Sequence, residues 1–467
     1  MKQDQHGRNV TRRAHATLIG LALAAGACGP AAVDWNALTA AAEARNPSGT
    51  RHKDANVGRL LSRPLTADSA ARIAVLNNRG LRAAVEDLGI AEGRLSQARR
   101  LPNPSVEGAM RFEGEGRPEL EVGAMIDLTD LLLLSSRSGA AGAEVEAAKL
   151  AAIGSVLDVT FDTRRAFYEY QAAAELLELR RKVLETFDAS ADLAKRLRAA
   201  GNITELDLAN QQSLFEEARF DVQNAEVEVR ASRERLNALM GLWGRGTEWR
   251  ADPRLPAIPA QEIALEKLES AAVERNLELA ILKQRVSAAD KRASLARAEG
   301  LLPELKAGVS AERADEWSVG PAVEIELPLF YQGQGAVGVA NAETRKQREL
   351  FADVAVNVRA SARNAVSRLN AKREAALHYK SVLLPLKARV VEQTQLEYNG
   401  MLVGLFQLLQ AKRDQVDTAA AYVERHREYW IARTNVEQLL AGRRYPEAAA
   451  LSSASRAAAS GGVEEAH

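Results

Sequence analysis

The sequence is poor in cysteine and in aromatic residues. Its 467 residues include one cysteine, Cys28, and aromatic residues make up 5% of the chain. A single cysteine excludes an intramolecular disulfide. The low aromatic content, together with frequent alanine, is typical of slender, closely packed helices rather than of a bulky globular core.

The sequence also lacks the patterns that catalysis, metal binding or nucleic-acid binding would need. The 62 Lys and Arg residues balance the 62 Asp and Glu residues, so there is no excess of basic charge for nucleic acid. None of the six histidines has a second ligand at metal-binding spacing, and no nucleophile elbow, P-loop or dinucleotide fingerprint occurs. We therefore expect no enzyme activity, no catalytic residue, no metal site, no cofactor beyond a covalent lipid, and no nucleic-acid partner. The stretch around His426 is interpreted as a solvated or interfacial helix face.

Long apolar runs are missing as well. Beyond the N-terminal segment, no run of apolar residues approaches 18, which is about the length that a transmembrane helix requires. If the protein crosses a membrane, it must therefore do so with β-strands.

The N-terminal segment predicts export. Basic residues precede a short apolar stretch over 16–27, so residues 1–27 are predicted to be a signal peptide. Ala25-Gly26-Ala27-Cys28 resembles a lipobox, in which Cys28 would carry a covalent lipid such as palmitate, although leucine is usual at the place of Ala25. The alternative is an ordinary signal peptide with an incidental cysteine. Residues 28–64 carry prolines among polar residues and are predicted to be an extended, lipid-anchored tether.

The remaining chain contains an internal duplication. Gly400 lies 199 residues after Gly201, and the same offset carries Ile126-Asp127-Leu128 onto Ile325-Glu326-Leu327 and Arg164 onto Arg363. We therefore expect a first repeat over 65–259, which ends in a connector, a second repeat over 260–442, and a disordered tail over 443–467.

Each repeat contains two segments in which apolar and polar residues alternate. These strand pairs are predicted at 104–128 and 304–328, with about 8–11 residues in each strand. The pattern is typical of transmembrane β-strands that turn apolar side chains to lipid and polar side chains to a lumen. The alternative is a pair of surface hairpins, half buried on a soluble core.

A long helical hairpin follows each strand pair, at 137–241 and 336–442. Apolar residues spaced three and four apart in the returning helices are typical of a coiled coil. Pro385 predicts a kink in the second hairpin. The expected fold is an internally duplicated α+β membrane protein with four transmembrane β-strands per chain and long coiled-coil hairpins.

Four short motifs, in this order and spacing, make the chain resemble the outer-membrane factors, the TolC-type channels of tripartite efflux and type I secretion systems. They are Leu101-Pro102-Asn103-Pro104-Ser105, residues 201–207, Tyr398-Asn399-Gly400, and residues 406–414. The resemblance covers about residues 65–442. It implies a homotrimer that closes a twelve-stranded β-barrel in the outer membrane, above a periplasmic tunnel of helices. It further implies a lipid-anchored location at that membrane, with a large periplasmic part, and contacts with outer-membrane lipid, a periplasmic adapter and an inner-membrane pump.

The resemblance assigns adapter docking to the two hairpin tips. The first tip comprises Gly201, Asn202, Ile203 and Thr204, and the second comprises Gly400, Met401, Leu402, Val403 and Gly404. An alternative for the glycines alone is that they serve only the tight turns.

The resemblance also places a periplasmic gate just inside the tips, at Asp207, Asn210, Gln407 and Gln410. Many relatives carry two aspartates after the second tip, where this chain has the two glutamines. Asp207, repeated three-fold, is therefore the only candidate for an acidic ring. The alternative for Asp207 is a carboxylate favoured by the dipole at a helix N-terminus.

Two other protein classes are alternatives to a channel. A periplasmic adapter lipoprotein would have one helical hairpin and compact β domains, whereas this sequence predicts two hairpins. A soluble coiled-coil scaffold would form no membrane-inserted trimer. The sequence does not identify the exported substrate, since drug, metal-ion and protein export all use this scaffold.

Overall fold

The computed structural model describes residues 33–46, 56–112, 118–263, 268–313 and 316–444. The predicted signal peptide, Cys28 and residues 445–467 of the predicted tail lie outside these residues. No helix in the described ranges combines the length and the apolar character needed to cross a membrane.

The chain forms two compact units. One contains residues 85–150 and 281–350, and the other contains residues 36–84, 151–280 and the chain from 351 onward. The chain leaves the first unit after residue 150 in the first repeat and after residue 350 in the second. These points are equivalent in the two repeats, so each repeat contributes matching segments to both units.

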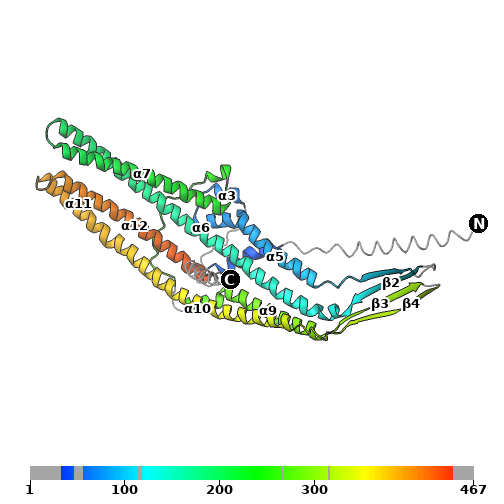
Figure 1. Ribbon diagram of the computed structural model, residues 1–467. Coiled ribbons are helices and arrows are strands. Elements are labelled where there is room, and N and C mark those ends of the chain that lie inside the picture. The colour runs from blue at the N-terminus through cyan, green and yellow to red at the C-terminus, as the bar shows by residue number, and fades with distance from the viewer. Residues whose placement is uncertain (1–32, 47–55, 113–117, 264–267, 314–315, 445–467) are drawn as a thin grey trace, which may run out of the picture. The chain divides into compact units, whose positions relative to one another are not determined.

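The first unit contains an antiparallel sheet in the order β1-β2-β3-β4 (Figure 1). The strands are β1 Ser105–Arg111, β2 Glu119–Asp127, β3 Glu304–Arg313 and β4 Trp317–Glu326. The two repeats meet where β2 pairs with β3, and Gly308 permits a close approach there, since a Cβ would lie 2.0 Å from the Ala124 carbonyl oxygen.

The register aligns the apolar positions of the four strands on one face of this sheet and the polar positions on the other, except at the hairpin end, where Arg313 lies opposite Leu120 on the apolar face. On the apolar face, Gly108 lies opposite Val122, Val122 opposite Ala311, and Ala311 opposite Val319. On the polar face, Asp127 lies opposite Lys306 and Lys306 opposite Glu324. Because side chains alternate along a strand, a slip of one residue would mix the two faces. The predicted alternation is thus confirmed as a property of the whole sheet.

Helix α6, Leu128–Ala199, begins nine residues before the predicted start at 137. Its first turn is capped because the Asp127 carboxylate accepts a hydrogen bond from the Asp130 amide at 2.9 Å. Thr129 ties this turn to β3: its hydroxyl donates to the Pro303 carbonyl at 2.9 Å and accepts from the Leu305 amide at 2.8 Å. These hydrogen bonds let the helix start directly at the end of β2. The periodicity of the sequence does not predict this early start, because two of the bonds involve residues far away in the sequence.

In the second unit, α7 (Glu205–Met240) runs back along α6 (Figure 1). The second hairpin consists of α10 Gln334–His378, the π-helical turn η2 Tyr379–Leu383, α11 Leu384–Asn399 and the returning α12 Leu405–Leu440. The irregular turn comes directly before Pro385, which has no amide hydrogen to continue the ladder. The kink predicted at Pro385 stays a prediction, and the structure places a π-helical turn directly before this residue.

The two hairpins share a buried apolar cluster. Val183 and Phe187 of α6 pack with Ala218 of α7 and Leu409 of α12. A second cluster joins Phe167 of α6 to residues of α4, of α7 and of the connector. The first cluster joins helices of both repeats, and the second packs helices of the first repeat against its connector.

The repeats also build matching corners. Asn78 lies between α4 (Ala67–Asn77) and α5 (Arg79–Ala98), and its side chain accepts from the Leu81 amide at 2.8 Å. Asn276 lies between α8 (Leu268–Arg275) and α9 (Leu277–Leu301), and its side chain accepts from the Leu279 amide at 2.9 Å. Each asparagine caps the longer helix.

The prediction of an extended tether over 28–64 is wrong for part of that segment. Residues Trp35–Arg45 form α2 and Val57–Leu61 form α3, which Asn56 caps by accepting from the Arg59 amide at 3.2 Å. Leu38 and Ala42 are 4% and 2% exposed. Spaced four apart, they form one buried helix face, and this burial orders a segment whose composition predicted no structure.

Candidate functional site

The first tip is a compact turn closed by an ion pair. The Asn202 amide donates to the Leu197 carbonyl at 2.9 Å, and Gly201 has φ 78°, which fits the usual glycine stop of a helix. Arg198 of α6 contacts Glu205 of α7 at 3.0 Å. The tip therefore presents both a left-handed glycine and a charged bridge between the two helices.

The second tip turns differently. Met401, not Gly400, takes the left-handed conformation, with φ 60°. Gly400 lies in the turn with φ −80°, a conformation that does not require glycine. Met401 and Leu402 are 93% and 77% exposed, so this tip presents an apolar surface where the first presents charge.

Asp207 closes the first turn of α7. Its carboxylate accepts from the Thr204 hydroxyl at 2.7 Å and from the Thr204 amide at 3.0 Å, and the Thr204 hydroxyl accepts in return from the Asp207 amide. These hydrogen bonds, the one from the hydroxyl first, lower the pKa of Asp207. The geometry of a single chain therefore explains Asp207 as a helix cap.

The other predicted gate residues occupy similar places. Gln407 accepts from the Gly404 amide at 2.8 Å and so caps α12, while Gln410 donates to the Asp414 carboxylate at 2.9 Å. Asn210 is exposed, as are Asp207 and both glutamines. All four side chains lie in the first two turns of α7 or α12, and their assembly into a gate stays a prediction.

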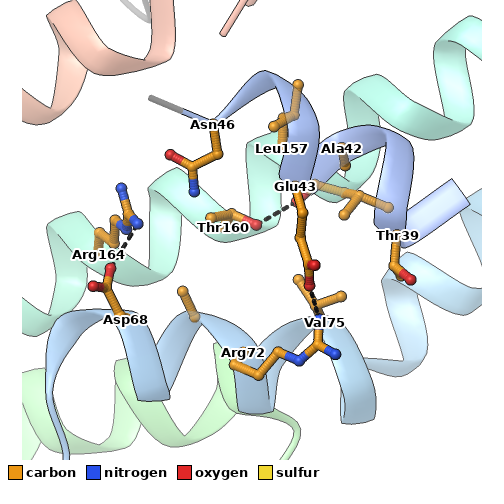
Figure 2. A pocket seen from close by; sticks show the side chains of 12 residues that line it. Thr39, Ala42, Glu43, Asn46, Asp68, Arg72, Val75, Leu157, Thr160 and Arg164 are labelled. Carbon is orange, nitrogen blue, oxygen red and sulfur yellow. Dashed lines mark hydrogen bonds and ion pairs between the residues drawn. The ribbon is translucent and has the colours of Figure 1, made fainter. Parts of the chain in front are cut away.

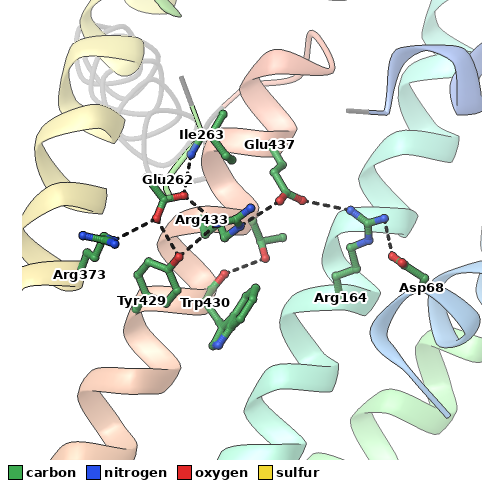
Figure 3. Close-up of polar contacts among 10 residues, drawn as sticks. Asp68, Arg164, Glu262, Ile263, Arg373, Tyr429, Trp430, Arg433 and Glu437 are labelled. Carbon is green, nitrogen blue, oxygen red and sulfur yellow. Dashed lines mark hydrogen bonds and ion pairs between the residues drawn. The ribbon is translucent and has the colours of Figure 1, made fainter. Parts of the chain in front are cut away.

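A row of alternating charges crosses the second unit (Figure 3). Arg164 of α6, 4% exposed, contacts Asp68 of α4 at 2.6 Å and Glu437 of α12 at 3.2 Å. Glu437 also contacts Arg433 at 3.3 Å. Buried charges need such partners because their desolvation is costly.

The row continues to Glu262, which follows the connector over 241–259. Arg433 contacts Glu262 at 2.8 Å, Arg373 of α10 contacts the same carboxylate at 3.6 Å, and the Tyr429 hydroxyl donates to it at 2.7 Å. Burial raises the pKa of Tyr429 to about 12, so the hydroxyl keeps its proton. These contacts lie within the second repeat, and the ion pair between Arg164 and Glu437 connects the two repeats. Sequence reasoning aligned Arg164 with Arg363 but could not find Asp68 or Glu437, because no spacing links residues so far apart.

A small cavity of about 50 Å³ lies beside this row, under α2 (Figure 2). Glu43 and Arg72 form an ion pair across it, and Asp68 and Arg164 line one end. Its volume suits a few water molecules and is far below that of a ligand pocket. We therefore assign it no binding role.

The connector is held between α6 and α12. Gln171 donates to the carbonyls of Asp252 and Arg254 at 3.0 and 2.7 Å, and Glu175 accepts from the Leu255 amide at 3.1 Å. From α12, Trp430 donates to the Pro256 carbonyl at 2.9 Å. The connector is thus a fixed part of the core.

Of the two interpretations of this helix face, solvated or interfacial, the solvated one is wrong for His426. Its side chain is 4% exposed, stacks on Tyr422 with 5.4 Å between ring centroids, and accepts from Trp430 at 3.3 Å. Burial first, and the nearby charge of Lys380 to a smaller extent, lower its pKa. His426 faces the connector, and the charged residues beside it in sequence, Arg425 and Glu428, contact each other instead.

Within the described part of the chain, no group of three or more His, Cys, Asp or Glu side chains is placed to hold a metal ion.

Comparison with known proteins shows what this chain is similar to. The family described as "Outer membrane efflux protein" matches residues 71–242. The chain is 23% identical over 393 residues to the cobalt-zinc-cadmium resistance protein CzcC of Cupriavidus metallidurans, covering 81% of this chain and 90% of that protein. It is 26% identical over 376 residues to the outer membrane protein OprJ of Pseudomonas aeruginosa, covering 71% and 75%.

A solved structure agrees with the fold. The open state of the outer membrane channel MtrE of Neisseria gonorrhoeae superimposes with a TM-score of 0.65 at 17% sequence identity, covering 80% of this chain and 89% of that one. Two hairpins, a shared four-stranded sheet and the family match over residues 71–242 point the same way: the chain is similar to the outer membrane efflux proteins, the TolC-type outer-membrane factors.

Proposed function

We propose that this protein is a trimeric outer-membrane channel of a tripartite efflux or type I secretion system, a passive duct from the periplasm to the exterior. The observation that carries the proposal is the sheet, whose apolar face runs unbroken across strands of both repeats. Val106, Val309 and Val323 on this face are 75%, 53% and 64% exposed. Apolar patches of this kind on a protein surface mark an interaction with lipid or protein.

Exposed aromatic residues lie near the hairpin ends of the strands. They are Phe112 and Trp317. Transmembrane strands are flanked by aromatic girdles at the two membrane interfaces. This arrangement supports a sheet that spans the outer membrane.

The sheet favours an assembly of three chains. Among the residues that the structure describes, the outer strands β1 and β4 each leave one edge without a partner strand, and lipid cannot satisfy those backbone groups. Twelve strands from three chains would close the sheet around a lumen, which four strands cannot do.

The helices support the same assembly. Val382, Leu386 and Val390, spaced four apart around η2 and α11, are 39%, 50% and 49% exposed, and Phe220 and Val227 of α7 are 62% and 56% exposed. Apolar residues at such spacing form helix contacts. In a homotrimer they would meet a neighbouring chain.

The two tips are the proposed docking surface for a periplasmic adapter, which in turn contacts an inner-membrane pump. The first tip offers the bridge between Arg198 and Glu205, and the second offers Met401 and Leu402. Docking at the first tip should therefore weaken with salt, and docking at the second should not.

We also propose that Cys28 carries the lipid anchor. Cys28→Ala should abolish acylation while the fold persists, since the described core begins beyond it. Mass spectrometry of the mature N-terminus tests this, and an unmodified terminus that begins elsewhere would show the proposal to be wrong.

The channel proposal is tested on the apolar face. Val122→Arg and Val323→Arg should each destabilise the trimer in membranes. The reason is that an arginine on the lipid-facing side of a strand, at the bilayer midplane, costs about 2–4 kcal/mol. Glu121→Gln and Glu324→Gln, on the polar face, are the controls and should assemble normally. The measurement is the fraction of heat-dissociable trimer in outer-membrane extracts. A monodisperse soluble monomer of the exported chain would sink the proposal.

A further inference from the structure

A cavity of about 570 Å³ lies where the strands meet the helices, within the unit that contains the sheet. The first turns of α6, the end of α9, the ends of the strands and the segment 327–331 enclose it. Its volume falls in the range of small-molecule binding sites. The first repeat builds no counterpart to segment 327–331, because there β2 runs directly into α6.

One side of the cavity is strongly acidic. Five carboxylates and one guanidinium line it: Asp127, Asp130, Glu299, Glu304, Glu326 and Arg137. Arg137 forms an ion pair with Asp130 and lies 3.7 Å from Glu299, so its charge is placed beside these two carboxylates.

Glu304 and Glu326 lie directly opposite each other in the β3–β4 register. Like charges in that position destabilise an antiparallel pair. Lys306 contacts Glu304 at 3.3 Å but is shared with Glu324 at 3.1 Å. The strand pair therefore keeps an unfavourable arrangement that a bound cation would relieve.

The other side of the cavity is apolar and exposed. Leu329, Phe330 and Tyr331 are 72%, 96% and 67% exposed. Their segment is fixed in place, because Gly300 packs so closely on it that a Cβ would lie 2.2 Å from the Gln332 carbonyl oxygen. Gly333, with φ 69°, turns the chain from this segment into α10.

We propose that this cavity binds an amphiphilic organic cation. Its charged group would lie against Glu304 and Glu326, and its aromatic or aliphatic body against Leu329, Phe330 and Tyr331. Aromatic faces add attraction for such a cation. The acidic lining disfavours anions and the phosphate of lipids. A bare metal ion would gain no binding free energy from the apolar side of the cavity.

The placement of this site on the export path rests on the proposed function, because the polar face borders the lumen only in a closed trimer. Binding itself does not depend on that proposal.

The test is calorimetric titration of the full-length protein in detergent with tetraphenylphosphonium, and in parallel with uncharged triphenylphosphine oxide. Glu326→Gln should weaken phosphonium binding about fivefold, as expected for one partly screened ion pair. Phe330→Ala should weaken it by a similar factor. The matched control is Glu312→Gln, since Glu312 opposes Glu121 in the same register but lies away from the cavity. It should leave binding unchanged.

Three results would overturn the inference: no phosphonium binding, equal affinity of wild type and Glu326→Gln, or equal affinity for the uncharged probe. Conductance of the same preparations in planar bilayers separates this from the proposed function. A protein that conducts but does not bind phosphonium would refute the proposed cation binding and leave the channel proposal standing. A protein that binds as expected but forms no channel refutes the proposed function alone.

Discussion

Arg164 and Arg363 occupy equivalent places in the two repeats, and each pairs with a carboxylate on a helix near the start of its own repeat. Arg164 is buried between Asp68 and Glu437, whereas the Arg363 side chain is 63% exposed and contacts Glu269 at 3.2 Å. Both repeats thus carry an arginine–carboxylate pair, and the buried arginine, Arg164, has a second carboxylate partner. That second contact, with Glu437, is the one that joins the two repeats.

The backbone corners diverged less than the charges. Gly241 and Gly442 end the returning helices with φ 64° and 93°, and each packs on the corner before α5 or α9, near the carbonyl of Asn77 or Arg275. A left-handed turn against a neighbouring backbone leaves no room for a side chain, so glycine persists in both copies. Side-chain chemistry, free of that constraint, could change.

The largest expected difference between the repeats concerns the two arginines. Arg164→Ala should lower the free energy of unfolding by about 3 kcal/mol, because it leaves buried Glu437 with one partner fewer. Arg363→Ala should cost less than about 1 kcal/mol, since its pair is exposed. Equilibrium unfolding in denaturant measures both, and equal losses would contradict the comparison.

The next difference is in pH dependence. The pKa of His426 is lowered from its usual 6.5 by burial, so the unfolded chain binds a proton more readily than the folded one. Stability should therefore fall as pH drops below about 6.5, by at most about 1.4 kcal/mol per pH unit. His426→Phe should remove this part of the dependence. The residue of α7 that lies 199 positions before His426 is Val227, which carries no ionisable group, so the first repeat should contribute nothing to the pH dependence at this position.

The tips should respond in opposite directions. Gly201→Ala places a side chain in a left-handed conformation with no neighbour within 4 Å, so strain alone should destabilise the hairpin by about 1 kcal/mol. Met401→Gly should relieve the same kind of strain and stabilise by up to about 1 kcal/mol, less the added flexibility of the unfolded chain. Denaturant unfolding measures both. A destabilising Met401→Gly would mean that the methionine side chain holds the tip by contacts.

The smallest expected effect concerns the gate. Asp207→Ala should weaken cation preference and divalent block in single-channel recordings, by less than about fivefold because the carboxylate is exposed and screened. Gln407→Ala, which removes the equivalent cap at the second tip, should leave selectivity unchanged. If Asp207→Ala alters neither conductance, selectivity nor block, no acidic ring exists and closure rests on helix packing.

Local patterns in the sequence were enough to predict the duplicated order of strands and hairpins. Alternation of period two marked all four strands, and Pro385 marked the irregular turn, because each depends on neighbouring residues only. The helical order of Trp35–Arg45 was missed since its helix is stabilised by burial of Leu38 and Ala42 against other segments. His426 was misjudged for the same reason: its charged neighbours in sequence are not its neighbours in space.

The sequence by itself determined the two repeats, the faces of the strands and the family, because periodicity, turn residues and short motifs are local and survive duplication. Only the tertiary structure decided which of two equivalent arginines is buried, which tip residue turns left-handed, and that Glu304 faces Glu326 beside an apolar segment. Those outcomes depend on contacts between residues tens to hundreds of positions apart. Burial and strand register determine these outcomes, and no single stretch of the sequence determines either of them.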